Sequence, residues 1–224
     1  MTRTSVAIDI HSQNWNNNNA FSQVVYIDTN AIIDIFEQRP NGQATEDYIK
    51  ELVNQNGLII WSDHTMDELT DFVHVNEYIS YARANGVQRM GRKHPWKVAE
   101  DIVSDQQSAN IASTVHTKMD QITTYLEQFG MQADVEFNKA KELTKEVHMH
   151  YGGNRKDSKH VAIANLNGVN DILTHDSGFL RYPVNVFGAS AEIKNNYDPN
   201  MPHSQYVDLS ESLLKKEDDE ENTG

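Results

Sequence analysis

The sequence predicts an α/β fold with a parallel central sheet, flanking helices and a helical insertion. Short apolar runs alternate with stretches of helical spacing in the first and last parts of the chain, a pattern typical of parallel sheets with crossover helices. Two of these runs lead to an aspartate: 24–27 is followed directly by Asp28, and 171–174 is followed by His175 and then Asp176. The middle of the chain has no strand-like run and is dominated by long polar helical patterns.

Each element in the first part of the chain is delimited by residues that favour or stop it. The apolar, largely β-branched run at 24–27 predicts a buried strand. Proline cannot continue a helix, so Arg39-Pro40 ends the first helical stretch. The predicted elements are a strand over 24–28, a helix up to 39–40, a helix over 45–55, a strand over 58–61 and a helix from about 65 toward 75.

The later elements are predicted in the same way, with Gly168 closing a helix after its last turn. They are helices over about 98–128, 133–149 and 157–167, a strand over 171–175 and a short strand over 184–187. The resulting organisation is an irregular or disordered leader over 1–22, an α/β domain over 23–190 that contains a helical insertion at about 76–150, and a C-terminal extension over 191–224.

The composition excludes several classes of protein. The chain has no cysteine, which excludes disulfides, thiolate zinc sites and cysteine nucleophiles. Its net charge of −14 argues against a protein that coats nucleic acid with a broadly positive surface. Five consecutive acids at 217–221 predict a solvated acidic tail. No apolar stretch approaches a membrane span and no signal-peptide core is present, so a cytoplasmic protein without membrane contact is expected.

The two aspartates that follow apolar runs are the main indication of chemistry. Ligands of open α/β sheets bind at the carboxyl ends of the strands, which is where Asp28 and Asp176 are predicted to lie. Carboxylates that crowd together repel each other, and a bound metal ion is the usual way to keep them ionised. The sequence therefore predicts a divalent-cation site at this edge of the sheet.

Four local patterns follow one another along the chain. They are the strand that ends in Asp28-Thr29-Asn30, Glu68-Leu69 in the helix after the second strand, Asp157 at the start of a helix of small residues, and a strand that ends in Thr174-His175-Asp176 before an aromatic residue. In this order they resemble the PIN-domain family of metal-dependent nucleases. The resemblance covers roughly 23–75 and 150–190, and leaves out the leader, the tail and most of the insertion.

The resemblance implies a PIN-like domain with an acidic cluster of Asp28, Glu68, Asp157 and Asp176 that holds Mg²⁺ or Mn²⁺. Oxygen-only ligands suit these ions. The implied reaction is hydrolysis of RNA phosphodiester bonds by a metal-bound water. Residues expected to hold a carboxylate or a water beside the metal are Asn30, Thr174 and Ser177.

Each of the four acids also has a local structural interpretation. Asp28 is a favoured helix N-cap residue, and Thr65 with Glu68 has the spacing of a capping box. Asp157 fits a charge that stabilises a helix N-terminus, and Asp176 fits a turn residue. Four such coincidences in family order are less probable than one site, so the metal site is the preferred interpretation.

Two histidines lie beside these acids in the sequence. His160 follows Asp157 by one helical turn and is interpreted as a partly buried structural residue, with substrate contact as the alternative. His175 alternates with Thr174 and Asp176 along a strand, so its side chain is expected on the opposite face of the sheet and is not assigned to catalysis.

A basic segment stands out in this acidic chain. Cations interleaved with an aromatic residue suit phosphate contact and base stacking on single-stranded RNA. The alternative is a solvated loop whose tryptophan anchors to the core. The candidate RNA-binding residues are Arg89, Arg92, Lys93, Trp96 and Lys97 in this segment, with Arg155 and Lys159 beside Asp157.

The leading hypothesis is therefore a metal-dependent endoribonuclease, for which single-stranded DNA is a second substrate class. Small PIN proteins are often toxins, so the resemblance allows an antitoxin partner or a homo-oligomer. One alternative is a non-catalytic PIN-like module that binds RNA or protein. Another is a different Mg²⁺-dependent α/β phosphohydrolase, although a haloacid-dehalogenase-type enzyme needs an aspartate where Asn30 stands.

Overall fold

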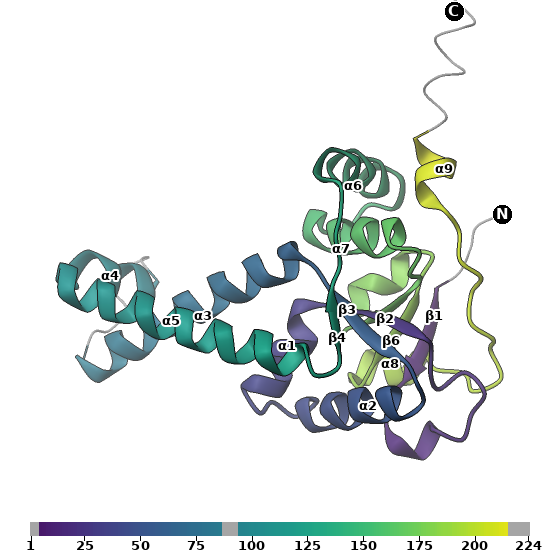
Figure 1. The fold of residues 1–224 in the computed structure, drawn as a ribbon, viewed down its shortest axis with the longest axis horizontal. Helices are drawn as coiled ribbons and strands as arrows, with labels where there is room; N and C mark the ends of the chain where they lie inside the picture. The colour runs from purple at the N-terminus through teal and green to yellow at the C-terminus, as the bar shows by residue number, and fades with distance from the viewer. Residues whose placement is uncertain (1–4, 87–93, 215–224) are drawn as a thin grey trace, which may run out of the picture. The chain divides into compact units, whose positions relative to one another are not determined.

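The computed structural model describes residues 5–86 and 94–214 and confirms the predicted α/β fold. Within these residues all strands of the sheet run parallel, in the order β1-β6-β5-β2-β3-β4 (Figure 1). The strands are β1 (Val6–Asp9), β2 (Val24–Ile27), β3 (Leu58–Trp61), β4 (Gly130–Gln132), β5 (Asp171–Leu173) and β6 (Asn185–Gly188). None of the helices in the described part of the chain is long and apolar enough to cross a bilayer.

The chain divides into two compact units. The first comprises Met1–Thr65 and Phe129–Gly224, and the second comprises Met66–Gln128. The first unit contains the sheet, two short 3-10 helices η1 (Ser12–Asn14) and η2 (Ser177–Arg181), and the helices α1 (Thr29–Phe36), α2 (Gly42–Asn54), α6 (Phe137–Tyr151), α7 (Arg155–Leu166), α8 (Ala191–Asn196) and α9 (Leu209–Leu213).

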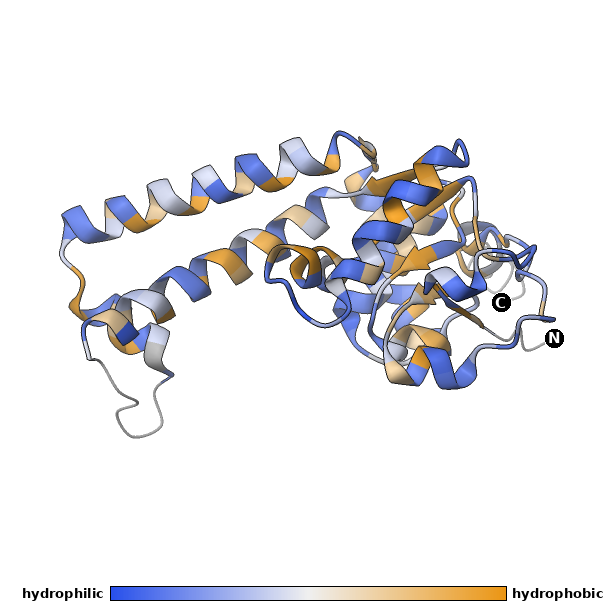
Figure 2. Ribbon diagram, turned by 90° about the horizontal axis from the view of Figure 1, so that it is seen from below, coloured by the Kyte–Doolittle hydropathy of each residue, from blue (hydrophilic) through white to orange (hydrophobic). Residues whose placement is uncertain are grey.

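Helices cover both faces of the sheet because its strands are apolar on both sides. Figure 2 shows hydrophobic residues concentrated in the strands. Neighbouring residues of a strand point to opposite faces. On β6, Val186 belongs to the core cluster that includes residues of α6 and α7, whereas the Phe187 ring lies 5.9 Å from the Tyr48 ring of α2. Such two-sided burial explains why the strands read as continuous apolar runs.

The pairing of β2 with β5 brings two predicted site residues to the same level. Tyr26 pairs with Ile172 and Ile27 with Leu173, so the next residues along the two strands are Asp28 and Thr174. Gly188 on β6 allows the chains to approach closely here, because an added Cβ would lie 2.2 Å from the Thr174 carbonyl oxygen. The carboxyl ends of β2, β5 and β6 therefore meet at one edge of the sheet.

Two strands were not predicted from the sequence. Residues 6–9 of the predicted irregular leader form β1, which is buried beside β6. β4 lies inside the predicted insertion, and its three residues carry no apolar alternation. With β4, helix α6 belongs to the first unit, and the second unit covers Met66–Gln128.

The second unit consists of helices. It holds most of α3 (Asp63–Ala84), then α4 (Pro95–Ile102) and α5 (Asp105–Leu126). The single helix predicted over 98–128 is interrupted because Val103 and Ser104 are extended, and Ser104 forms a capping box with Gln107 that starts α5. Within the unit, Tyr78 and Ser108 share a hydrogen bond of 3.3 Å.

Candidate metal centre

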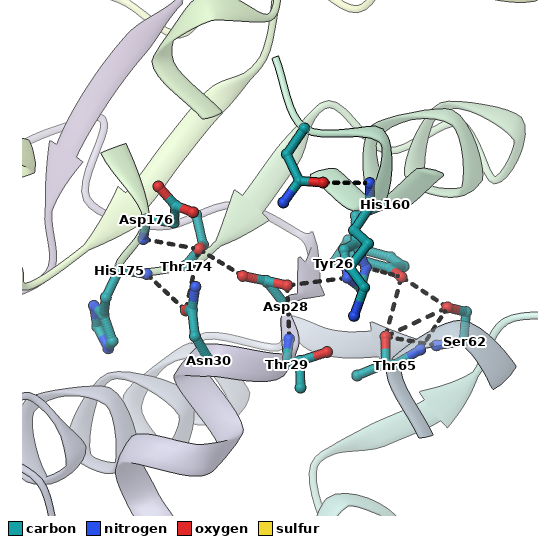
Figure 3. A network of polar contacts seen from close by, with 12 residues as sticks. Tyr26, Asp28, Thr29, Asn30, Ser62, Thr65, His160, Thr174, His175 and Asp176 are labelled. Carbon is teal, nitrogen blue, oxygen red and sulfur yellow. Dashed lines mark hydrogen bonds and ion pairs between the residues drawn. The ribbon is translucent and has the colours of Figure 1, made fainter. Parts of the chain in front are cut away.

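Asp28 follows β2 directly and is the N-cap residue of α1, which confirms its capping interpretation. Its role as a metal ligand stays a prediction. The residue is 4% exposed. Its Oδ1 accepts a hydrogen bond of 2.8 Å from the Thr29 amide. The Thr174 hydroxyl donates to the other oxygen, Oδ2, at 2.8 Å. Figure 3 shows the Asp28 carboxylate between Thr174 on one side and His160 on the other.

His160 contacts Asp28 from α7. Its Nε2 lies 3.2 Å from Asp28 Oδ1, and its Nδ1 lies 2.9 Å from the Tyr26 hydroxyl. That hydroxyl is in turn 2.7 Å from Ser62 Oγ. His160 is only 1% exposed, so it is buried more deeply than predicted. The contacts fix the orientation of the Asp28 carboxylate through a chain of polar groups that reaches the start of α3.

The predicted supporting residues Asn30 and Thr174 also contact this edge of the sheet. Thr174 Oγ1 accepts the Asp176 amide at 3.1 Å, and Asn30 Oδ1 accepts the His175 amide at 3.0 Å. The loop after β5 is thereby tied to the first turn of α1, as Figure 3 shows. Ser177, the third predicted supporting residue, is half-buried and opens η2.

Asp157 and Asp176 approach each other over Gly178. An added Cβ at Gly178 would lie 2.9 Å from Asp176 Oδ1 and 3.5 Å from Asp157 Oδ2. Asp157 lies in the first turn of α7, behind the N-cap residue Asn154, and is half-buried. Asp176 is exposed and accepts the Gly178 amide at 2.7 Å. The fold therefore brings Asp157 and Asp176, which are both predicted site residues, close to the same glycine.

The pKa of Asp157 is consistent with its closeness to the other acids. Burial, followed by the negative charges of Asp176 and Asp28, raises the pKa of Asp157 to about 6, although His160 and Arg181 oppose the rise. An isolated aspartate has a pKa of about 3.9. Like charges that raise a pKa in this way are typical of carboxylates arranged around a cation. Three of the four predicted acids are thus electrostatically coupled.

Asp28, Asp157 and Asp176 remain the predicted ligands of a metal ion. The donors are oxygens only, which suits Mg²⁺ or Mn²⁺. Oxygens of Asp28, Asp157 and Asp176 do not all lie within 4.8 Å of one another. Direct binding by all three carboxylates would therefore draw them closer together, whereas Mg²⁺ commonly reaches some of its ligands through bound waters.

Glu68, the fourth predicted ligand, lies on the part of α3 that belongs to the second unit, so its membership of the site stays a prediction. The capping-box interpretation of Thr65 and Glu68 is wrong. Helix α3 begins at Asp63, which makes Thr65 its third residue rather than its N-cap. The Thr65 hydroxyl instead lies 3.1 Å from the Tyr26 hydroxyl.

His175 has a structural environment on the other side of the strand. Its Nδ1 accepts the Ala189 amide at 3.1 Å, and its Nε2 lies 2.8 Å from Thr45 Oγ1. Burial lowers the pKa of His175 to about 4, against the opposing effect of Asp34. A neutral imidazole matches these contacts because only an unprotonated Nδ1 can accept the amide.

Arg181 is a cation near the acids that sequence reasoning missed. Its Nε donates to the Gly178 carbonyl at 3.0 Å, and its charge lowers the pKa of Asp157. The pattern of Asp176 followed by an aromatic residue does not predict that Arg181, at the end of η2, lies near the carboxylates. Arg181 is therefore a candidate to contact a phosphate bound at this edge.

The predicted RNA-binding residues are distributed over several parts of the chain. Arg89, Arg92 and Lys93, like the acidic tail at 217–221, lie outside the described residues. Trp96 and Lys97 lie on α4 in the second unit, where Lys97 Nζ is 5.2 Å from the centre of the Trp96 ring. Arg155 and Lys159 lie on α7, the helix that carries Asp157.

No protein-family model matches the chain, and no curated protein matches it significantly. The resemblance to the PIN-domain family therefore rests on the four sequence patterns and stays a prediction.

Proposed function

We propose that the protein is a PIN-type, metal-dependent endoribonuclease that hydrolyses RNA phosphodiester bonds at the carboxyl ends of β2 and β5. The observation that carries the proposal is the convergence of three acids from separate elements: Thr174 of the loop after β5 contacts Asp28, and Asp157 and Asp176 both flank Gly178. The raised pKa of Asp157 beside Asp176 and Asp28 agrees with this geometry. The order and type of these acids agree with the family that the sequence resembles. An antitoxin partner follows from the same resemblance, and a cytoplasmic location follows from the lack of an apolar span and of a signal-peptide core in the sequence; both are further parts of the proposal.

The side chains around the acids support a division of roles. Asp28, Asp157 and Asp176 would hold Mg²⁺ or Mn²⁺, with Glu68 as the fourth ligand of the proposal. When bound, such an ion supplies an activated water and charge stabilisation on the leaving oxygen. Thr174 and His160 hold Asp28 in one orientation through contacts of 2.8 and 3.2 Å. Fixed ligands of this kind lower the cost of organising the site.

The experiment that tests this function is cleavage of labelled, mixed-sequence RNA and single-stranded DNA by the full chain with Mg²⁺, Mn²⁺ or EDTA. We expect cleavage with either metal and none with EDTA. RNA carrying 2′-O-methyl groups should still be cut, because attack by a metal-bound water does not use the 2′-hydroxyl. Wild-type protein that folds but cuts neither nucleic acid, or cuts equally well in EDTA, would contradict the proposal.

A phosphate monoester serves as the control for the other phosphohydrolase class. Under the proposal, p-nitrophenyl phosphate is hydrolysed far more slowly than RNA under the same metal conditions. Rapid monoester hydrolysis without RNA cleavage would instead support a small-molecule phosphohydrolase.

A further inference from the structure

A second feature of the first unit is a pocket of about 400 Å³ between α6 and α7. The two helices pack side by side (Figure 1). Phe137, the first residue of α6, lines the pocket and is 76% exposed, which is unusual for a phenylalanine. The small side chains of Ala140 and Thr144 form part of the wall on the same helix.

The pocket is positively charged in a chain whose net charge is −14. Three of its lining residues, here called the pocket cations, are Lys141, Arg155 and Lys159, and Lys156 lines it as well. Among the described residues, no carboxylate lies within ion-pair distance of any of the three pocket cations. Cations gathered without acidic partners are suited to bind an anionic ligand.

Helix α7 carries residues of the pocket and also Asp157. Arg155 and Lys159 are four residues apart and therefore share one face of the helix, whereas Asp157 points to a different face. An α-helix with its side chains is about 10–12 Å wide. A nucleic-acid strand bound at the Asp157 carboxylate therefore needs to span only about one helix width to reach the pocket.

We propose that the α6–α7 pocket binds a nucleotide of single-stranded RNA, with its base against the Phe137 ring and its phosphates beside the pocket cations. This inference rests on the proposed function for the identity of the ligand. An exposed aromatic ring beside several cations is the combination that binds single-stranded nucleic acid, since every base has a face that can stack. The pocket would hold substrate next to the metal centre.

A larger cavity elsewhere in the first unit lacks these properties. It measures about 700 Å³ and lies at the amino ends of the strands, lined by Val24, Leu58 and Asp171 among others. The Asp171 carboxylate there accepts hydrogen bonds from Ser22 and Asn185. A half-buried carboxylate whose hydrogen bonds are already made does not attract phosphate, so the larger cavity is not the RNA pocket.

The test is binding of a fluorescently labelled, mixed-sequence single-stranded RNA to the full chain in EDTA, where metal-dependent cleavage is stopped. We expect Phe137→Ala to weaken binding roughly tenfold and Phe137→Tyr to retain it, because stacking survives in tyrosine. Lys159→Gln should reduce the slope of log affinity against log salt by about 0.7, the value for one lost phosphate contact with a single strand. Phe137→Ala should leave that slope unchanged.

Lys139→Gln is the matched control, since Lys139 is exposed on α6 but does not line the pocket. It should change neither affinity nor slope. Binding of Phe137→Ala within twofold of wild type would overturn the proposal. An oligoglutamate peptide that binds as tightly and loses as much with Phe137→Ala would also overturn it, in favour of an acidic-peptide pocket.

Failure of this inference and failure of the proposed function give different results. If the wild-type protein cuts RNA but the pocket variants bind RNA normally, the pocket assignment is wrong and the nuclease assignment is supported. If the variants weaken RNA binding as expected but no metal supports cleavage, the pocket stands as an RNA-binding site and the nuclease assignment falls.

Discussion

Replacing Asp176 with asparagine is expected to reduce metal-dependent RNA cleavage by about a thousandfold or more, without unfolding the protein. A metal ion contributes several kcal/mol to stabilising the transition state, and about 1.4 kcal/mol corresponds to a factor of ten in rate. The side chain of Asp176 is exposed, and its one described capping contact, with the Gly178 amide, can be made by asparagine as well. Steady-state cleavage rates and thermal unfolding of the same preparations measure the two effects.

Glu192→Gln is the control for the change in charge. Glu192 is exposed in the first turn of α8 and is not one of the predicted ligands. Its substitution should leave cleavage within about twofold of wild type, as is usual for surface changes away from a site. An Asp176→Asn protein that keeps more than about a tenth of wild-type cleavage would show that Asp176 does not hold the catalytic ion.

Replacing Asp157 with asparagine is expected to stabilise the metal-free protein at pH 8 by about 1–2 kcal/mol. Burial and the nearby charges of Asp176 and Asp28 raise the pKa of Asp157 to about 6 in the folded state. A rise from about 3.9 to about 6 corresponds to about 3 kcal/mol, and exposure of half of the side chain to solvent reduces this value. Asparagine carries no charge and is not repelled by its neighbours.

The sign of the pH dependence follows from the direction of that shift. Between about pH 4 and pH 6 the folded protein binds a proton at Asp157 and the unfolded chain does not, so wild-type stability falls as the pH rises. The advantage of Asp157→Asn should therefore be absent near pH 4, grow up to about pH 6 and stay constant above it. Urea unfolding in EDTA at several pH values measures this difference. A variant less stable than wild type at pH 8 would contradict the described repulsion.

The strands that the sequence predicted are those whose residues are apolar and β-branched. β2, β3, β5 and β6 have such runs, and their predicted positions agree with the structure. The sequence of β1 is equally apolar, but the asparagine-rich segment after it obscured the signal. β4 is formed by Gly130–Gln132, and its pairing with β3 depends on tertiary structure rather than on local preference.

Some features of the candidate site could likewise be predicted from the sequence, and others could not. The positions of Asp28 and Asp176 at the ends of strands could be predicted, because Asp28 directly follows an apolar run and Asp176 follows another within three residues. The contact of His160 with Asp28 and Tyr26 could not, since helical spacing gives the face of a residue but not what packs against it. The α6–α7 pocket could not be predicted for the same reason, since the helical pattern of 137–151 does not show that this helix packs against α7.

The measurement that tests the central claim most directly is titration of the metal-free chain with Mn²⁺ at pH 6 by calorimetry in two buffers of different ionisation enthalpy. Metal binding must displace the proton that Asp157 holds at this pH. We predict one saturable site that releases a fraction of a proton, with binding strongly weakened in Asp28→Asn, Asp157→Asn and Asp176→Asn. Binding that is unchanged in all three variants, or no saturable binding by the wild-type protein, would contradict a metal centre built on these acids.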